Sequence, residues 1–266
     1  MAFINYPDKF SLKKKTAYVT GGAGLLGSEI STALATAGAQ TIILDIEDNK
    51  GKTLVQKLKA KGFKAHYVHF DVTDISRLEK NCKELLQKYK AMDVWVNCAY
   101  PQTKDWWNKK VEELSLESWT KNVDMNLHSA AWLNKIVATI MKAKGGGSLI
   151  NIGSIYSVVG NDFTIYEGTN MMGSMPYSVI KGGIANLTRF MAAYFGPHGV
   201  RVNNICPGGI LNNYDPRFVK NYSRKTPLKR MGKPEEVAAA VLFVASEAAS
   251  YITGTNIMVD GGWTAI

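Results

Sequence analysis

The segment TAYVTGGAGLLGSEISTALATAG, residues 16–38, combines a strand, a turn and a helix in immediate succession. Its first five residues, TAYVT, are apolar and β-branched, which predicts a strand over 16–20. GGAGLLG at 21–27 supplies the glycines of a tight turn, and SEISTALATAG at 28–38 has a helical pattern that ends at Gly38. This order is the context in which a dinucleotide pyrophosphate binds, because free backbone N–H groups and the helix dipole meet its charge.

Strand-like and helix-like segments alternate along the rest of the chain. The next strand is expected at 41–46, in the segment TIILDI, and further strands are expected at 64–72, 92–99, 147–154, 199–207 and 256–262. Such alternation predicts a parallel sheet covered by helices on both faces. We therefore expect an α/β fold with one Rossmann-like, doubly wound domain over 1–266. Within it we expect an N-terminal extension at 1–14, an insertion near the active site at 155–176 and a basic substrate-binding loop at 211–233.

Composition places the chain among ordinary globular proteins that bind small molecules. It has 266 residues, 46% of them hydrophobic, and a formal charge of +10. The lysines are spread along the chain, and no run is longer than Lys13 to Lys15, which argues against nucleic acid as a partner. A basic surplus also attracts small anionic substrates to a cleft, and this reading favours an enzyme.

Cysteine, histidine and hydropathy patterns indicate a cytoplasmic location. Cys82, Cys98 and Cys206 are far apart and form no Cys-x-x-Cys pair, so reduced thiols are expected. The four histidines are scattered, and no metal site is expected. No apolar run reaches the roughly 18 residues of a membrane-spanning helix, and the first residues lack the apolar core of a signal peptide, so no membrane partner is expected.

Tyr177 and Lys181 stand four positions apart in a segment with a helical pattern. This spacing places both side chains on one helix face, where the lysine cation favours the phenolate and lowers the tyrosine pKa. Tyr177 would then serve as a general acid/base near neutral pH. The pattern alone is weak, since it also occurs at Tyr100 and Lys104. The alternative is that Tyr177 only packs in its helix.

Asp45 ends the second predicted strand, 24 residues after Gly21. A carboxylate at this place accepts hydrogen bonds from the adenosine ribose hydroxyls and repels a 2′-phosphate. No arginine is near in sequence, although Lys50 and Lys52 follow. NAD is therefore favoured over NADP. The alternative is that Asp45 caps a helix.

The whole chain resembles the short-chain dehydrogenase/reductase family. The matching residues stand in the family's order: the turn from Thr20 to Gly27, Asp71 with Val72, Asn97 with Ala99, Asn126, Ser154, Tyr177, Lys181, Pro207 with Gly208, and the terminal VDGG at 259–262. The length and the C-terminal half resemble the classical branch, whereas the glycine spacing resembles the extended branch, since the classical spacing would place a glycine at Leu25.

The resemblance implies a catalytic set of Asn126, Ser154, Tyr177 and Lys181. Ser154 would donate a hydrogen bond to the substrate oxygen, and Tyr177 would exchange a proton with it. Lys181 would hold the nicotinamide ribose, and Asn126 would anchor a water of the proton relay. The cofactor-binding residues implied are Gly21, Gly24, Leu26, Gly27, Asp45, Asp71, Val72, Asn97, Ala99, Tyr177, Lys181, Pro207 and Ile210. The resemblance also implies a homo-oligomer, a dimer or a tetramer.

Departures from the family pattern suggest where the substrate binds. Tyr100 replaces a usual glycine after the fourth strand, and Asn212 stands where a threonine commonly contacts the nicotinamide amide. Ser154 precedes Tyr177 by 23 residues, more than is usual, and the extra residues run from Gly160 to Met175. The polar members of this insertion are Asp162, Tyr166, Glu167, Thr169 and Asn170. We expect Tyr100, Glu167, Asn212 and Arg217 to contact substrate. The insertion has the alternative roles of a surface loop or an oligomer contact.

A narrower resemblance links SVVGNDFTIYEGTN, PYSVIKGGI and PLKRMGKPEE to short-chain oxidoreductases of flagellin modification and nonulosonate glycan biosynthesis. It implies NAD-dependent interconversion of an alcohol and a ketone on a sugar, sugar-phosphate or nucleotide-sugar. Cations of the basic loop are candidates to hold an anionic group, namely Arg217, Lys220, Arg224, Lys225, Lys229 and Arg230. The alternatives are a 3-oxoacyl carrier-protein reductase and, from another class, a non-catalytic dinucleotide-binding regulatory subunit.

Overall fold

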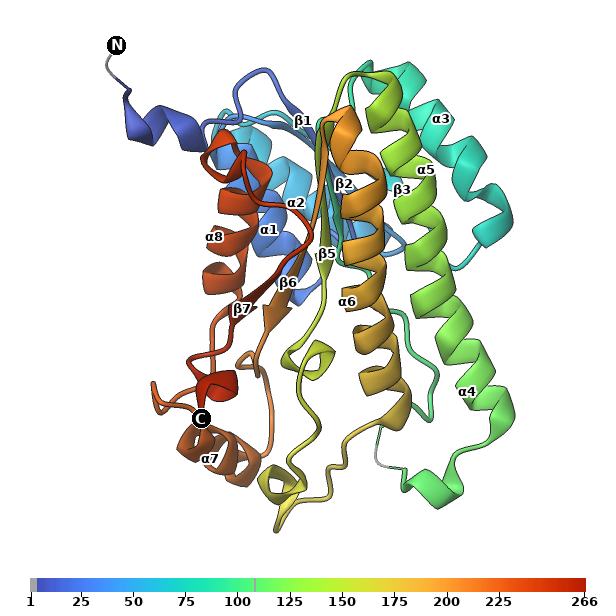
Figure 1. The fold of residues 1–266 in the computed structure, drawn as a ribbon, viewed down its shortest axis with the longest axis vertical. Coiled ribbons are helices and arrows are strands. Elements are labelled where there is room, and N and C mark those ends of the chain that lie inside the picture. The colour runs from blue at the N-terminus through green and yellow to red at the C-terminus, as the bar shows by residue number, and fades with distance from the viewer. Residues whose placement is uncertain (1–3, 108) are drawn as a thin grey trace.

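A parallel seven-stranded sheet forms the centre of the molecule, in a computed structural model that describes residues 4–107 and 109–266 (Figure 1). The strand order is β3-β2-β1-β4-β5-β6-β7, and every neighbouring pair is parallel. The strands are β1 (Thr16–Thr20), β2 (Gln40–Asp45), β3 (Ala65–His69), β4 (Val94–Asn97), β5 (Gly147–Ile152), β6 (Val200–Pro207) and β7 (Asn256–Val259). The predicted Rossmann-like fold is confirmed.

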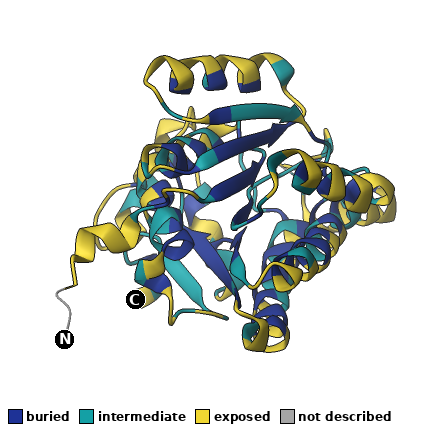
Figure 2. Ribbon diagram, turned by 90° about the horizontal axis from the view of Figure 1, so that it is seen from above, coloured by how far each residue is buried: buried dark blue, intermediate teal, exposed yellow. Residues whose placement is uncertain are grey.

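Helices cover both faces of the sheet. The described helices are α1 (Leu25–Thr36), α2 (Asp48–Ala60), α3 (Leu78–Tyr89), α4 (Leu116–Val123), α5 (Ser129–Ala143), α6 (Met175–Phe195), α7 (Pro216–Lys225) and α8 (Pro234–Ala245). α1, α2 and α8 lie on one face, and α3, α5 and α6 lie on the other (Figure 1). Seen from above, the central strands are buried between these layers, the edge strands β3 and β7 are only partly buried, and the outer surfaces of the helices are exposed (Figure 2).

Apolar side chains from alternate positions of the strands fill the space beneath each helical layer. On the α3, α5 and α6 side, the fully buried rings of Tyr18 and Trp95 stack with their centres 5.5 Å apart. The Tyr18 hydroxyl donates to the Ala91 carbonyl at 2.8 Å, so this buried polar group is paired. On the other side, Ile30 and Leu34 of α1 pack with residues of α8. Both layers hold the carboxyl ends of the strands in fixed positions.

The expectation that residues 211–233 form only a loop was wrong, because the segment contains α7. Asp215 caps the helix by accepting from the Arg217 N–H at 2.7 Å, and a proline occupies the first turn, where its missing N–H costs nothing. Phe218 and Tyr222 are the buried residues of α7. They pack against Ile155, Ile165 and Trp263 in a small separate core.

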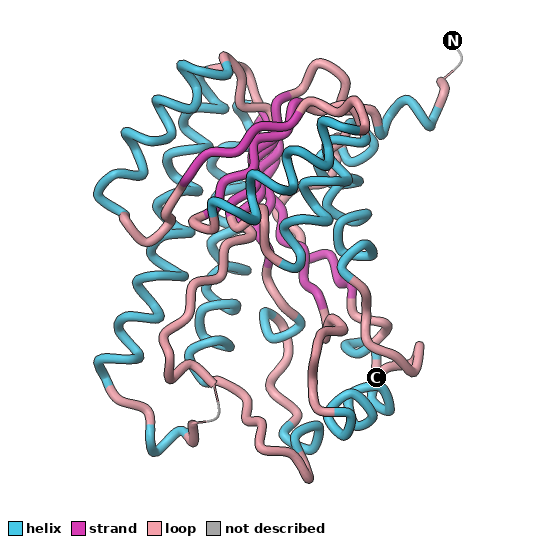
Figure 3. Tube along the Cα trace, turned by 180° about the vertical axis from the view of Figure 1, so that it is seen from behind, coloured by secondary structure: helices cyan, strands magenta, loops and turns pink. Residues whose placement is uncertain are grey.

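The insertion and α7 lie side by side at the carboxyl end of the sheet (Figures 1 and 3). The Asn221 amide donates to the carbonyl oxygens of Ile165 and Glu167 at 3.3 and 3.0 Å, and an Arg217 nitrogen donates to that of Gly168 at 2.8 Å. We call this unit, residues 155–174 with α7, the cap. Among the described residues, no helix is both long and apolar enough to cross a membrane.

Candidate active site

A cavity of about 510 Å³ opens at the carboxyl ends of the strands, beneath the cap. It lies where β1 pairs with β2 on one side and β4 on the other, so the chain winds in opposite directions from this point. Ligands of open α/β sheets bind at such a switch point. The cavity extends from the glycine turn after β1 to residues of the insertion and α7.

The glycine turn has the geometry of a pyrophosphate cradle. Gly21 has a φ of +62°, and a Cβ there would meet Ala99 Cα at 2.7 Å. A Cβ on Gly27 would collide with the Gly21 carbonyl oxygen, which allows the turn to fold onto the start of α1. Gly24 is the N-cap of α1 and offers no side-chain cap. The first N–H groups of the helix are therefore free to meet an anion.

Asp45 lies at the edge of the cavity next to the glycine turn. Its carboxylate accepts from the Ala23 N–H at 2.9 Å and from the Glu47 N–H at 3.0 Å, which fixes its orientation and leaves further lone pairs. The two nearby lysines are already paired, Lys50 with Glu47 at 3.6 Å and Lys52 with Asp48 at 3.3 Å. Each of these ion pairs is neutral overall, so the unbalanced charge at this edge of the cavity is the carboxylate of Asp45.

Ser154, Tyr177 and Lys181 all line the cavity. Ser154 is 4% exposed at the end of β5, and Lys181 is 7% exposed one helical turn after Tyr177 on α6. Lys181 Nζ donates to the Ile152 carbonyl at 2.7 Å and lies 5.5 Å from the centre of the Tyr177 ring. The structure thus brings three of the four predicted catalytic residues to one place.

Burial dominates the protonation of this group. It raises the pKa of Tyr177 to about 12, against an opposing effect of the Ser154 hydroxyl, and lowers the pKa of Lys181 to about 8. The predicted lowering of the Tyr177 pKa by Lys181 was wrong for this structure: desolvation of the phenolate raises that pKa, and the opposing effect comes from the Ser154 hydroxyl.

Asn126, the fourth predicted catalytic residue, lies behind Lys181 in a π-helical turn over Asp124–His128 that joins α4 to α5. Its amide nitrogen donates to the carbonyl oxygens of Pro101 and Asn122 at 2.9 and 3.0 Å. Asn126 and Lys181 line a second, small cavity of about 20 Å³. This volume suffices for one water molecule, since about 10–15 Å³ is required.

The other predicted cofactor residues lie in three places. Gly21, Gly24, Leu26, Gly27, Asp45, Pro207 and Ile210 line the main cavity. Val72, Asn97 and Ala99 line the small cavity instead, and Asp71 lies outside both, with its carboxylate accepting from the Thr73 N–H at 2.8 Å. Asn97 donates to Asn151 at 2.9 Å, so its side chain ties β4 to β5.

Of the predicted substrate contacts, Tyr100 lines the cavity, but Glu167, Asn212 and Arg217 do not. Arg217 is directed to the Gly168 carbonyl, which makes it a link within the cap. Other cations of the 211–233 segment are also engaged: Lys225 with Asp162 at 2.8 Å, and Arg230 with Glu236 at 2.6 Å. Among the described residues that line the main cavity, the charged ones are Asp45 and Lys181.

Aromatic side chains form much of the cavity wall, which sequence reasoning missed. They are Trp107, Tyr156, Tyr166, Tyr214, Phe218 and Tyr222, and two amides, Gln102 and Asn161, accompany them. The one sequence signal was the tryptophan pair at 106–107 in the loop after β4. The remaining aromatic residues come from the insertion, from α7 and, for Tyr214, from the turn before α7, and their packing brings them together.

The chain belongs to the short-chain dehydrogenase/reductase family, whose members are oxidoreductases that bind NAD(P). A family model described as enoyl-(acyl carrier protein) reductase matches residues 22–264. The post-translational flagellin modification protein A of Campylobacter coli is 29% identical, over 95% of this chain and 99% of its own length, in agreement with the narrower resemblance seen in the sequence.

Two solved structures show the same fold with different cofactors bound. A gluconate 5-dehydrogenase from Burkholderia cenocepacia, in complex with NADP and tartrate, is 28% identical with a TM-score of 0.88, covering 98% of this chain and 100% of its own. A short-chain dehydrogenase from Leptospira borgpetersenii with bound NAD⁺ is 32% identical with a TM-score of 0.83, covering 99% and 97%. Family membership therefore leaves the choice between NAD and NADP to this chain's own residues.

Proposed function

We propose that the protein is an NAD-dependent oxidoreductase that interconverts a secondary alcohol and a ketone on an uncharged, hydroxylated substrate of the sugar type. The observation that carries this proposal is the meeting of Ser154, Tyr177 and Lys181 in one cavity with the glycine turn. The relative from Campylobacter coli, named for post-translational flagellin modification, supports a role in that process. A cytoplasmic location and a homo-oligomeric state are part of the same proposal.

The proposed roles follow from the chemistry of each group. Ser154 donates a hydrogen bond to the reacting oxygen and stabilises negative charge there. Tyr177 takes the proton of the alcohol during oxidation and returns it during reduction. Lys181 binds the nicotinamide ribose, and Asn126 with the small cavity supports a water that connects Lys181 to solvent. The bound cofactor supplies the hydride acceptor or donor, and its oxidised ring carries a positive charge that favours the phenolate.

Asp45 is the reason for proposing NAD. Its carboxylate stands at the cavity edge with paired lysines around it, so a 2′-phosphate would meet uncompensated negative charge. The ribose hydroxyls of NAD would instead donate to its remaining lone pairs. Residues of the glycine turn would hold the pyrophosphate.

The lining of the cavity supports an uncharged substrate and argues against the sugar-phosphates and nucleotide-sugars that the sequence also allowed. Apart from Lys181, no described residue lining it carries positive charge, and a desolvated phosphate would lack a partner. The aromatic rings and amides are suited to a hydroxylated carbon skeleton, with rings against C–H groups and amides against hydroxyls. A 3-oxoacyl carrier-protein reductase is disfavoured by Asp45, because that activity usually uses NADP.

The test replaces Tyr177 with phenylalanine. The wild-type protein, screened with NAD⁺ against polyols and with NADH against the matching ketoses, should show absorbance change at the nicotinamide band. Tyr177→Phe should reduce turnover by roughly 10²–10⁴-fold, as loss of a general acid/base does. The dissociation constant for NADH should change less than threefold. Retained turnover in this variant would refute the assignment, and NADH binding without any turnover in wild type would favour the regulatory subunit.

A further inference from the structure

The loop between β4 and α4 brings an amide side chain, Gln102, and an aromatic side chain, Trp107, to the wall of the main cavity. The indole nitrogen of Trp107 donates to the Gln102 carbonyl oxygen at 3.1 Å. Since an indole can only donate, this contact assigns the oxygen of the Gln102 amide and turns its NH₂ group elsewhere. The centre of the Trp107 ring lies 6.2 Å from that of Tyr177, with 46° between the planes. The two residues therefore stand beside the proposed acid/base.

Trp107 packs against its neighbour Trp106, with the ring centres 6.0 Å apart. Trp106 is 4% exposed and packs with Ile180 and Ile184 of α6, whereas Trp107 is 45% exposed. Consecutive residues thus face opposite ways, one into the core and one into the open cavity. The Trp106 ring also meets the Tyr177 ring edge-on, with centres 6.4 Å apart. The core side of this loop cannot shift without disturbing α6 at the catalytic turn.

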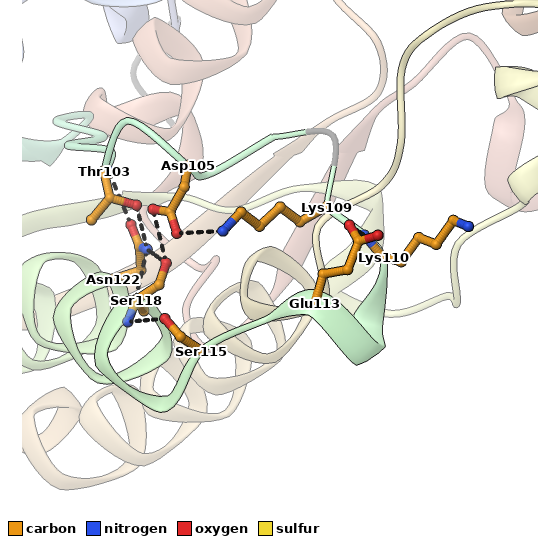
Figure 4. Close-up of polar contacts among 8 residues, drawn as sticks. All are labelled: Thr103, Asp105, Lys109, Lys110, Glu113, Ser115, Ser118 and Asn122. Carbon is orange, nitrogen blue, oxygen red and sulfur yellow. Dashed lines mark hydrogen bonds and ion pairs between the residues drawn. The ribbon is translucent and has the colours of Figure 1, made fainter.

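Asn122 of α4 holds the same loop by hydrogen bonds (Figure 4). It is fully buried, its amide nitrogen donates to Thr103 Oγ1 at 2.8 Å, and its oxygen accepts from the Thr103 N–H at 3.2 Å. The Ser118 hydroxyl, one turn earlier on α4, donates to the Asp105 carboxylate at 3.0 Å. Hydrogen bonds from the Thr103 side chain and then from Ser118 keep the pKa of Asp105 well below its usual range, at about 2. The loop is therefore attached to α4 at two successive positions.

Asn126, four residues after Asn122, attaches the start of the loop: its amide nitrogen donates to the Pro101 carbonyl at 2.9 Å and also to the Asn122 carbonyl at 3.0 Å. The two asparagines lie one turn apart on continuous helical backbone, so they bind one side of the loop together. The backbone on either side of Gln102 is thereby held, at Pro101 and at Thr103. The part of this loop from Pro101 to Trp107 is therefore a fixed wall of the cavity.

We propose that Trp107 and Gln102 recognise a cyclic, uncharged, hydroxylated substrate, and that Asn122 is the residue that positions them. A rigid indole face beside Tyr177 matches the flat C–H face of a six-membered ring, and an open chain presents no such face. The free NH₂ group of Gln102 donates to a ring hydroxyl. This inference rests on the proposed function and narrows it from hydroxylated compounds in general to rings.

The test compares two uncharged polyols with six carbons and six hydroxyls, myo-inositol and D-sorbitol, with cyclohexane-1,2-diol and butane-2,3-diol as a second pair. Oxidation is followed with NAD⁺, and binding is followed by tryptophan emission in the Tyr177→Phe protein with NADH. The cyclic member of each pair should bind more tightly and have the higher kcat/KM. Trp107→Ala should lower kcat/KM for the cyclic members about fivefold to tenfold and change the open-chain members less than twofold. Trp107→Phe should retain most of the preference.

The proposed positioning role of Asn122 is tested by substituting Thr103, which lies outside the proposed catalytic and binding groups. Thr103→Val removes the hydroxyl that accepts from Asn122, and Thr103→Ser keeps it. Thr103→Val should raise KM for the cyclic members severalfold with kcat and the NADH dissociation constant nearly unchanged, and Thr103→Ser should behave as wild type. Lys109→Met, which breaks only the partly exposed ion pair with Asp105, is the matched control and should have little effect.

Several results would overturn the inference. These are equal binding of cyclic and open-chain members, equal loss of both with Trp107→Ala, or no binding of any cyclic member. Turnover of open-chain alcohols alone would refute the inference and leave the proposed oxidoreductase function standing. Absence of turnover with every alcohol and ketone would instead count against the proposed function, and emission changes with myo-inositol would still support the ring site.

Discussion

Lys181 Nζ lies 5.5 Å from the centre of the Tyr177 ring and 2.7 Å from the Ile152 carbonyl oxygen. The first contact places a cation beside the proposed acid/base, and the second ties it to the end of β5. Lys181 is buried and Tyr177 is half-buried, and desolvation opposes the charged form of each. The site therefore keeps an ionisable pair in a place that is unfavourable for folding and useful for proton transfer.

Lys181→Met should stabilise the folded protein at pH 7 while impairing turnover. Burial lowers the folded-state pKa of Lys181 from 10.5 to about 8, so below pH 8 the folded protein must bury a charged lysine. Removing it should increase the free energy of unfolding by on the order of 1 kcal/mol, after the loss of its hydrogen bond is counted.

The difference in the free energy of unfolding between Lys181→Met and wild type should decrease as the pH rises from 8 to 10.5. Between pH 8 and 10.5 the unfolded chain still binds the proton that the folded protein has released, so wild-type stability rises with pH and the advantage of the variant shrinks. Urea unfolding of both proteins at several pH values measures it. Lys57→Met, at an exposed position of α2, controls for loss of charge. A less stable variant at pH 7, or a difference that does not change with pH, would contradict this account.

Asp45→Asn should shift cofactor preference toward NADP. The substitution removes the charge that repels a 2′-phosphate and weakens the acceptor for the ribose hydroxyls. We expect the ratio of kcat/KM for NAD to that for NADP to fall about 10- to 100-fold, since hydrogen bonds to charged groups are worth about 1.5–3 kcal/mol.

The control for Asp45 is Glu47→Gln, which removes a nearby surface carboxylate paired with Lys50. It should change the ratio less than threefold. If wild type binds NADPH as tightly as NADH, or if the two variants behave alike, the role given to Asp45 is wrong.

Asn221→Ala should loosen the cap without affecting the cofactor end of the cavity. Its amide holds two carbonyl oxygens of the insertion, at Ile165 and Glu167. Loss of these bonds should lower stability by about 1 kcal/mol and raise substrate KM severalfold, because the aromatic walls of the insertion and α7 would no longer be held together. Thermal unfolding, NADH titration and substrate kinetics separate the effects.

Lys225→Met is the control for the cap, since it breaks the ion pair with Asp162 that also joins α7 to the insertion. Partly exposed ion pairs contribute little, so stability and KM should remain close to wild type. A change in NADH affinity with Asn221→Ala would contradict the prediction that the cap contacts only substrate. An effect of Lys225→Met as large as that of Asn221→Ala would contradict the role given to the Asn221 hydrogen bonds.

Local patterns were sufficient to predict the sheet and most of the helices. The glycines of the turn, the apolar strands and the spacing of Tyr177 and Lys181 are properties of short segments, and each is decided by backbone sterics or by helical periodicity. α7 was not predicted, because its mean polarity is high and its two buried aromatic residues are stabilised by distant parts of the chain. The strands also end earlier than their apolar runs, since β3 stops at His69 while the predicted segment continued to Val72.

By itself, the sequence determined the Rossmann-like fold, the family and the order of the candidate catalytic residues, because each depends on neighbours along the chain. The tertiary structure alone decided what faces the substrate. It joined Trp107 from one loop, Tyr166 from the insertion and Phe218 from α7 in a single wall, and paired Arg217 and Lys225 away from it. It also decided that desolvation raises the pKa of Tyr177, although a lysine lies one helical turn away. These properties depend on which distant side chains share a volume and exclude water, and no spacing in the sequence specifies that.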